Sequence, residues 1–304
     1  MLWIGLSVLS AFFYSLRYIV IKKYLGGASS FVIAFSMRFF GALAIAPFAF
    51  VPGGGAIDGK LFWAVILATA ALTGISSLIQ FHAVKNFEIS ASLPFLSFVP
   101  FFMTFWAYLI FGSLPGIYSA LGMLLLCSGA YSLNREKEAG GGPGAAGAGP
   151  EGLRGFLNGG GALFFASAAI LGLTTVLDKL AIENAGAGGL RYSICWNAFS
   201  ALLFSPFFFM RENYRSRVSQ FEAHLGYFAL QGVLGIAAFA AQMLAVEYCK
   251  HAAANVIYVK SLTMLQILFA VVIASFALGE KNGKRRAAAS IAMAAGAALV
   301  AAAR

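Results

Sequence analysis

The segment SSFVIAFSMRFFGALAIAPFAFV, residues 29–51, carries one charged side chain, Arg38, within an apolar run. About 20 apolar residues in a helix cross the hydrocarbon core of a bilayer, so this run is long enough to span a membrane. Too few residues separate Arg38 from Pro52 to form a span of their own. The segment therefore predicts a membrane helix that includes apolar residues on both sides of a guanidinium group.

The composition extends this prediction to the whole chain. Of its 304 residues, 61% are hydrophobic and 11% are charged, with a mean hydropathy of +0.84, whereas soluble domains carry about 25% charged residues. The net charge of +10 comes mainly from cations at the ends of apolar runs, which is typical of membrane topology signals and contacts with anionic lipids rather than of a nucleic-acid interface. We expect an integral, multi-pass protein of a bacterial cytoplasmic membrane, with no cofactor and no metal.

Ten apolar runs fit the length of a membrane span. In the first half they cover residues 2–21, 29–51, 61–82, 89–111 and 116–133, and in the second half residues 157–177, 190–210, 224–246, 252–278 and 286–303. Residues 134–155 lie between the halves and are rich in Gly, Ala and Pro, with charges at both ends, which is typical of a flexible linker. We predict an all-α polytopic membrane protein with five spans in residues 1–133, a linker at 134–155 and five spans in residues 156–304.

The two halves show a weak internal repeat. The matching features are VIKKYL from Val20 with VLDKLA from Val176, Pro47 with Pro206, HAVKNFEISAS from His82 with LAVEYCKHAAA from Leu244, and Gly112 with Gly279. Because each half has an odd number of crossings, the second half must enter the membrane in the opposite orientation. The expected architecture is ten transmembrane helices arranged as two inverted five-helix repeats.

Two longer motifs carry a family resemblance. They are SFVPFFMTFWAYLIFGS in the first half and VKSLTMLQILFAVVIASFALGEK in the second, and they occur beside the repeat and the glycine-rich fifth and tenth runs. The chain resembles the drug/metabolite transporter superfamily, EamA type, over nearly its whole length except the linker. The resemblance implies a transporter of amino acids, other metabolites, sugar phosphates or drugs. One departure is that the family's frequent Gly-Glu after the fourth helix is Gly279-Glu280 in the second half but Gly112-Ser113 in the first.

Cations within the runs are the first candidates for a binding site. A charge deep in a membrane helix costs a few kcal/mol and usually marks a pathway or a binding site. Arg38 either contacts an anionic substrate, for which its planar fork suits a carboxylate or phosphate, or pins neighbouring helices by bonding their carbonyls. Lys260 either faces a substrate or anchors its helix at the interface. Arg17 is predicted to reach the interface along its helix, because it lies close to Lys22.

Uncharged polar residues within the runs complete the candidate set. They are Tyr14, Gln80, His82, Asn197, Gln231, Gln242, Asn255, Tyr258 and Gln266. Hydrogen bonds between helices account for most such residues in membrane bundles. The substrate-binding residues that we predict are Arg38, Lys260, Tyr14, His82, Asn197, Gln242 and Tyr258.

The acidic residues closest to the spans fall at predicted helix ends. These are Glu88, Asp178, Glu247 and Glu280, and we expect structural roles for them. Interior cations without an interior carboxylate favour a substrate that carries an anionic group. A coupling proton would then be carried by His82, which can titrate near neutral pH, or by the substrate itself, and a counter-substrate is the other way to couple transport.

The sequence favours a secondary transporter that moves a small metabolite across the bilayer by alternating access. A membrane-embedded enzyme is the first alternative, but the chain has neither an H-E-x-x-H nor a G-x-S-x-G motif. The other alternative is a structural protein or a channel without saturable transport, which leaves the interior arginine unexplained. The expected partners are therefore a small-molecule substrate and the lipid bilayer, with no nucleic acid, and we expect no enzymatic activity.

Overall fold

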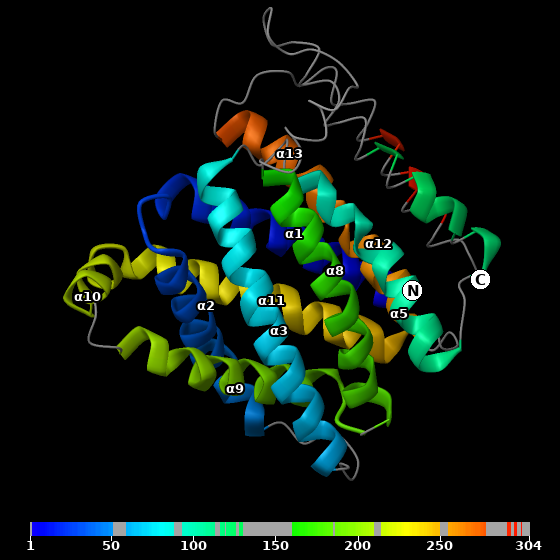
Figure 1. Ribbon diagram of the computed structural model, residues 1–304, viewed down its shortest axis with the longest axis horizontal. Coiled ribbons are helices and arrows are strands. Elements are labelled where there is room, and N and C mark those ends of the chain that lie inside the picture. The colour runs from blue at the N-terminus through cyan, green and yellow to red at the C-terminus, as the bar shows by residue number, and fades with distance from the viewer. Residues whose placement is uncertain are drawn as a thin grey trace, which may run out of the picture.

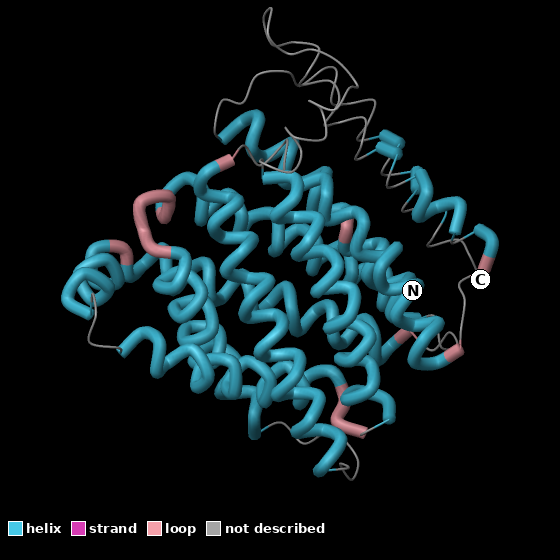
Figure 2. The backbone as a smooth tube through the Cα atoms, viewed as in Figure 1, coloured by secondary structure: helices cyan, strands magenta, loops and turns pink. Residues whose placement is uncertain are grey.

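The computed structural model describes most of the predicted spans. The described residues are 2–50, 59–87, 93–112, 160–184, 186–209, 214–249 and 255–277, with short pieces between 116 and 129 and between 291 and 299. Within these residues every regular element is a helix and none is a strand (Figure 2). The predicted linker lies outside the described residues, as do part of the fifth predicted span and most of the tenth.

The first half begins with four predicted spans. They are α1 (Leu2–Tyr24), α2 (Ser30–Ile45) with its 3-10 extension η1 (Ala46–Phe50), α3 (Gly59–Asn86), and η2 (Leu93–Phe98) followed by α5 (Val99–Phe111). Pro47 lies at the change from α2 to η1, as expected for a residue that cannot donate a helical hydrogen bond. α5 ends at Gly112, whose φ of 64° is the left-handed conformation that glycine adopts easily.

The second half contains four predicted spans and one unexpected helix. The spans are α8 (Gly160–Lys179) with the π-helical turn η3 (Leu180–Asn184), α9 (Gly189–Phe209), α11 (Leu225–Tyr248), and α12 (Asn255–Thr263) followed by α13 (Leu265–Ala277). The predicted span over 252–278 therefore consists of two helices separated at Met264. The helix α10 (Tyr214–Ala223) was not predicted, because its sequence is polar and falls between two apolar runs.

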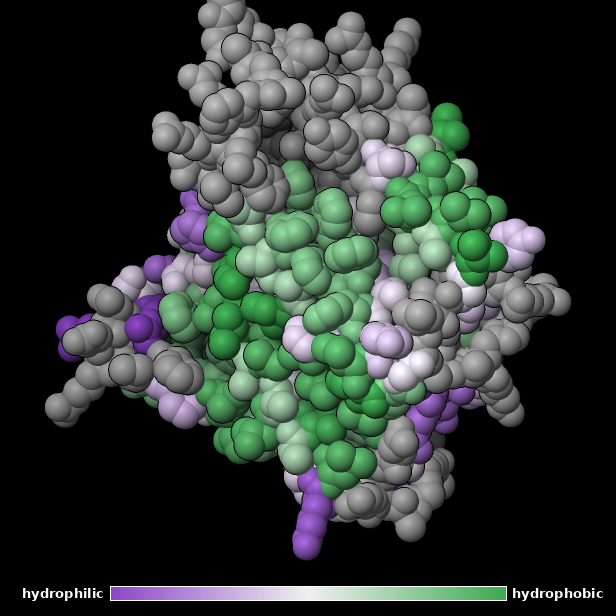
Figure 3. Space-filling model, turned by 45° about the vertical axis from the view of Figure 1, so that its right-hand side comes forward, coloured by the Kyte–Doolittle hydropathy of each residue, from purple (hydrophilic) through white to green (hydrophobic). Residues whose placement is uncertain are grey.

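Six of the described helical segments are long and apolar enough to cross a membrane. They are Leu2–Tyr24, Ser30–Phe50, Gly59–Asn86, Gly161–Glu183, Leu225–Tyr248 and Val256–Ala274, and the segment Phe95–Phe111 is apolar but shorter. Hydrophobic residues gather over the middle of the face that Figure 3 shows. Trp63 and Phe105 expose 54% and 53% of their surface, as expected for side chains whose solvent is lipid.

Contacts between the halves follow a reciprocal pattern. Helix α1 packs against α11 and α13, and helix α8 packs against α3 and α5. Helices α2 and α9 also pack against each other. The loop between α1 and α2 lies at the upper left of Figure 1, and the loop between α8 and α9 lies at the lower right. The first helix of each half is thus surrounded by helices of both halves, which places a shared interior between them.

Candidate functional site

A cavity between the helices is lined by four charged side chains. Arg17 of α1 and Arg38 of α2 contribute guanidinium groups, and Asp178 of α8 and Lys260 of α12 contribute a carboxylate and an ammonium group. Each of the four exposes at most 8% of its surface. The cavity volume is about 70 Å³. The uncharged polar lining consists of Tyr14, Tyr18, Thr73, Ser77, Gln80, Thr174, Thr175, Asn197, Gln242 and Gln266.

Arg38 is held by side chains from two other helices, α3 and α9. Its Nη2 donates to Ser77 Oγ at 3.3 Å, and its Cζ lies 4.2 Å from the ring centroid of Trp196, which is a cation–π arrangement. Asn197 Nδ2 donates to the backbone oxygen of Arg38 at 3.0 Å. A Cβ on Gly41 would lie 2.9 Å from Asn197 Nδ2, so the glycine leaves room for this contact. The guanidinium is thus positioned by side chains, while its charge has no carboxylate within 4 Å among the described residues.

Arg17 lies at the same end of the cavity. Its Nη1 contacts Met37 Sδ at 3.4 Å, and its Cζ lies 4.9 Å from the ring centroid of Tyr14 and 4.8 Å from that of Tyr18. Its Nε is buried without a hydrogen-bond partner in the part of the chain that the structure describes. A weak sulfur acceptor and the faces of nearby aromatic rings, including that of Phe81 at 5.8 Å, satisfy few of the five donors of this guanidinium. Arg17 and Arg38 therefore form an end of the cavity with two positive charges and spare donors.

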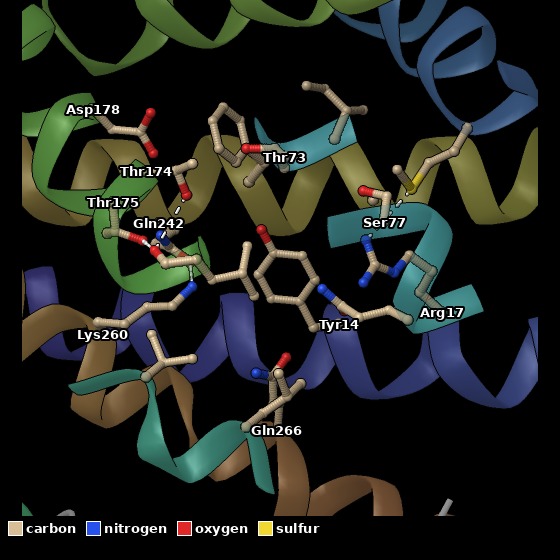
Figure 4. Close-up of a pocket in the computed structure, with 18 of the residues that line it drawn as sticks. Tyr14, Arg17, Thr73, Ser77, Thr174, Thr175, Asp178, Gln242, Lys260 and Gln266 are labelled. Carbon is tan, nitrogen blue, oxygen red and sulfur yellow. Dashed lines mark hydrogen bonds between the residues drawn. The ribbon is translucent and has the colours of Figure 1, made fainter. Parts of the chain in front are cut away.

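The other end of the cavity holds Asp178 and Lys260. Lys260 Nζ donates to Gln242 Oε1 at 3.1 Å, and Asp178 Oδ1 accepts a hydrogen bond from Tyr192 OH at 2.5 Å. Asp178 and Lys260 lie close enough to interact electrostatically without a direct ion pair. Figure 4 shows the ring of Tyr14 between this end and the arginine end. The cavity thus has two polar ends that differ in net charge.

A hydrogen-bond network next to the cavity joins three helices. Tyr18 OH of α1 donates to Gln80 Oε1 of α3 at 2.7 Å. Gln80 Nε2 lies 3.0 Å from Ser76 Oγ and 2.8 Å from Ser167 Oγ of α8, and the two serine oxygens are 2.6 Å apart. Such networks fix helices relative to one another where lipid offers no alternative partner. Gln80, which we predicted only as a helix-joining residue, has this role here and also lines the cavity.

Comparison with known proteins identifies the family. The EamA-like transporter family matches residues 1–135 and 158–302. The chain belongs to this family. No curated protein matches the sequence. Among solved structures, one described only as "Crystal structure of protein" superposes with a TM-score of 0.61 at 15% identity, covering 97% of this chain and 98% of that chain; at this identity the likeness shows the fold alone. The family resemblance predicted from the motifs is therefore confirmed.

In this EamA-like chain, the structure brings five of the seven predicted site residues to the cavity. They are Arg38, Lys260, Tyr14, Asn197 and Gln242. His82 does not line it: the side chain is exposed near the end of α3, where Asn86 Nδ2 donates to the backbone oxygen of His82 at 2.9 Å. Tyr258 is half-buried against the apolar core and also lies outside the cavity lining. Lys260 faces the interior and is not an interfacial anchor, since only 6% of it is exposed.

Two cavity residues were missed from the sequence. Arg17 was expected to reach the interface, which is wrong, because its side chain points into the cavity instead. Asp178 lies one residue before the end of α8, as expected, but the π-helical turn η3 follows, and the side chain is buried and lines the cavity. The signal that could have found Asp178 is its place in VLDKLA, where apolar residues continue after the two charged ones.

Proposed function

We propose that the protein is a secondary transporter in the cytoplasmic membrane of a bacterium and that it moves a small metabolite with an anionic group by alternating access. The observation that carries this proposal is the pair of buried guanidinium groups, Arg17 and Arg38, in one cavity. Among the described residues neither has a carboxylate within 4 Å. We assign the counter-charge to the substrate.

The cost of burying these charges supports a charged substrate. A buried cation without a partner is destabilising by several kcal/mol, and a second cation nearby adds repulsion. An anionic group bound between Arg17 and Arg38 would offset both costs and use the spare donors of the two guanidinium groups. Carboxylate and phosphate oxygens accept two parallel hydrogen bonds from one arginine, so these two groups suit the site best.

The arrangement of the helices supports alternating access. Reciprocal contacts, α1 with α11 and α8 with α3, are the pattern expected of two inverted halves, residues 1–133 and 156–304, joined by a linker. In transporters built this way, a site at the interface of the halves opens to one side and then to the other as one half moves against its partner. The cavity described above has residues from both halves, as this mechanism requires.

The test uses Arg38→Gln, which keeps a polar side chain of moderate length but removes the charge. We expect purified wild-type protein to be stabilised against thermal unfolding by an anionic metabolite, because a ligand that binds the folded state raises its stability. The panel contains L-glutamate, succinate, inorganic phosphate, a sugar phosphate, a nucleoside and an organic cation. In proteoliposomes the same anion should enter with saturable kinetics, and Arg38→Gln should reduce uptake to background.

The matched control is Arg215→Gln, the same change on the exposed surface of α10. This variant should transport at the wild-type rate. Normal uptake by Arg38→Gln, stabilisation only by cationic compounds, or flux that does not saturate would each contradict the proposed function.

A further inference from the structure

We infer that Asp178 carries a coupling proton, so that the protein moves its anionic substrate together with a proton. This inference rests on the proposed function and adds the coupling ion to it. It departs from the expectation that no carboxylate lies within the bundle and that His82 or the substrate carries the proton. The carrying observation is the hydrogen-bonded position of Asp178 inside the cavity, where the carboxyl group has suitable partners in both protonation states.

The partners of Asp178 form a chain of hydroxyl groups. Tyr192 OH of α9 lies 2.5 Å from Asp178 Oδ1 and 3.1 Å from Thr69 Oγ1 of α3. Thr69 Oγ1 also lies 2.8 Å from the backbone oxygen of Val65, to which it donates. Thr69 therefore keeps its lone pairs available to accept a hydrogen bond from Tyr192. All three side chains expose at most 6% of their surface.

This chain satisfies the carboxyl group whether or not it holds a proton. When Asp178 is ionised, Tyr192 O–H donates to it. When Asp178 is protonated, its own O–H can donate to the oxygen of Tyr192, and the Tyr192 O–H can turn to Thr69 Oγ1. A hydroxyl group allows this exchange because it is both donor and acceptor. No heavy atom has to move, so neither state leaves a buried polar group without a partner, which would be costly.

The charged and titratable groups around Asp178 come from four helices. Lys260 of α12 is the cation that faces it most directly, and Tyr14 of α1 and Tyr192 of α9 also face it. On its own helix, Lys179 points elsewhere and pairs with Glu183 at 3.5 Å. Lys260 is bound to Gln242 rather than directly to Asp178. Protonation of Asp178 thus does not break an ion pair, and Lys260 keeps its hydrogen bond.

The charge balance of the cavity links the proton to the anion. With Asp178 ionised, the lining holds three cations and one carboxylate; with Asp178 protonated, it holds three cations and no anion. Protonation therefore strengthens the binding of an anionic substrate, and by thermodynamic reciprocity the bound anion strengthens the binding of the proton by the same factor. Couplings of this kind usually amount to about 5- to 150-fold. The two ligands would load and unload together.

The experiment compares two modes of transport in proteoliposomes with wild-type protein and Asp178→Asn. The probes are radiolabelled L-glutamate, succinate and inorganic phosphate. Exchange is measured with the same probe and pH on both sides, and accumulation is measured with an inward proton gradient as the driving force. Wild-type protein should perform both for at least one probe. Asp178→Asn should lose accumulation driven by the proton gradient, because the amide cannot release a proton.

Two further variants sharpen the result. Glu183→Gln makes the same acid-to-amide change outside the cavity and should behave as wild type. Tyr192→Phe keeps the ring but removes the hydroxyl group that serves both protonation states, and it should shift the pH dependence of accumulation while exchange at the optimal pH persists. If Asp178→Asn does not fold, this second variant still tests the inference, since an unchanged pH profile would contradict it.

The outcomes separate the coupling from the transport itself. Exchange together with gradient-driven accumulation in Asp178→Asn would overturn the coupling role and leave the transporter intact. A wild-type protein that exchanges its probe but does not respond to a proton gradient would do the same. A wild-type protein that exchanges none of the probes would contradict the proposed function and this inference with it.

Discussion

Two loops of the molecule are fastened to neighbouring helices in different ways. In the first half, Lys85 Nζ at the end of α3 donates to the backbone oxygen of Ala28, between α1 and α2. Lys22 Nζ at the end of α1 donates to the backbone oxygens of Lys85 at 3.1 Å and of Phe87 at 2.9 Å. Two lysines thus tie the end of α1, the loop after it and the end of α3 together.

The second half makes the corresponding connection with an acid. Glu247 at the end of α11 accepts a hydrogen bond from the backbone N–H of Gly189, at the start of α9, at 2.7 Å. The matching motifs align Glu247 with Lys85 and Asp178 with Lys22. Asp178, however, does not bond the end of α11; it lines the cavity. The position of Lys22 in the first half thus ties helix ends together, whereas the matching position in the second half, Asp178, supplies a charge to the cavity.

The largest effect is expected from Asp178→Lys. This variant places a lysine at the position that matches Lys22 of the first half. The variant places a fourth cation in the cavity and removes its only charged acid among the described lining residues. Like charges in a buried site repel, and an unpaired buried charge is destabilising by about 3–5 kcal/mol. We expect transport to fall to background and the thermal unfolding temperature to drop, measured by probe uptake in proteoliposomes and by a melting curve in detergent.

Asp178→Asn serves as the comparison for this variant, because it removes the acid without adding a cation. It should unfold at a higher temperature than Asp178→Lys. Wild-type transport by Asp178→Lys would mean that the position has no role in the cavity and that the two halves are equivalent there.

A smaller effect is expected from Lys22→Met, which removes the two hydrogen bonds from Lys22 to the end of α3 but keeps an apolar side chain of similar length. Lys22 is half-buried, so solvent weakens its two hydrogen bonds to backbone oxygens. A hydrogen bond of this type contributes about 1 kcal/mol to stability. We expect the free energy of unfolding to fall by about 1–2 kcal/mol, measured by denaturant titration in detergent micelles.

Transport by Lys22→Met should continue, because Lys22 does not line the cavity. Lys23→Met is the matched control, since Lys23 is exposed and its ammonium lies over the ring of its neighbour Tyr24. Equal stability of the two variants would show that the fastening by Lys22 contributes nothing measurable.

The membrane spans could be predicted from the sequence, whereas one helix break and one surface helix could not. Apolar runs located every described span, because the length of a membrane helix is fixed by bilayer thickness. The place of the break at Met264 could not be predicted, since apolar residues continue on both sides of it. Helix α10 was missed because its stability comes from packing rather than from periodicity: the ring of Phe221 stacks on those of Phe40 and Phe228.

The site was predicted in part for a similar reason. Arg38 and Lys260 stand out in sequence as charges far from the ends of apolar runs. Arg17 and Asp178 stand close to such ends, and a single sequence does not reveal on which side of a helix a charge lies or how far the helix continues. Conversely, His82 has suitable chemistry but lies on an exposed face, which only the packing of α3 determines.

The smallest effect is expected from Glu247→Gln, which can keep the hydrogen bond between α11 and the start of α9 but removes its negative charge. The amide oxygen can still accept the hydrogen bond from the N–H of Gly189, so only the charge assistance and the attraction to the start of α9 are lost. Each contribution amounts to about 0.3–1 kcal/mol at an exposed helix N-terminus. We expect a decrease of less than about 1 kcal/mol in the free energy of unfolding and unchanged uptake.

Glu247→Lys, which would match Lys85 of the first half, cannot accept this hydrogen bond and should destabilise the protein more. If Glu247→Lys is as stable as Glu247→Gln, the N–H of Gly189 does not need an acceptor from α11, and the two loops are not fastened by equivalent contacts.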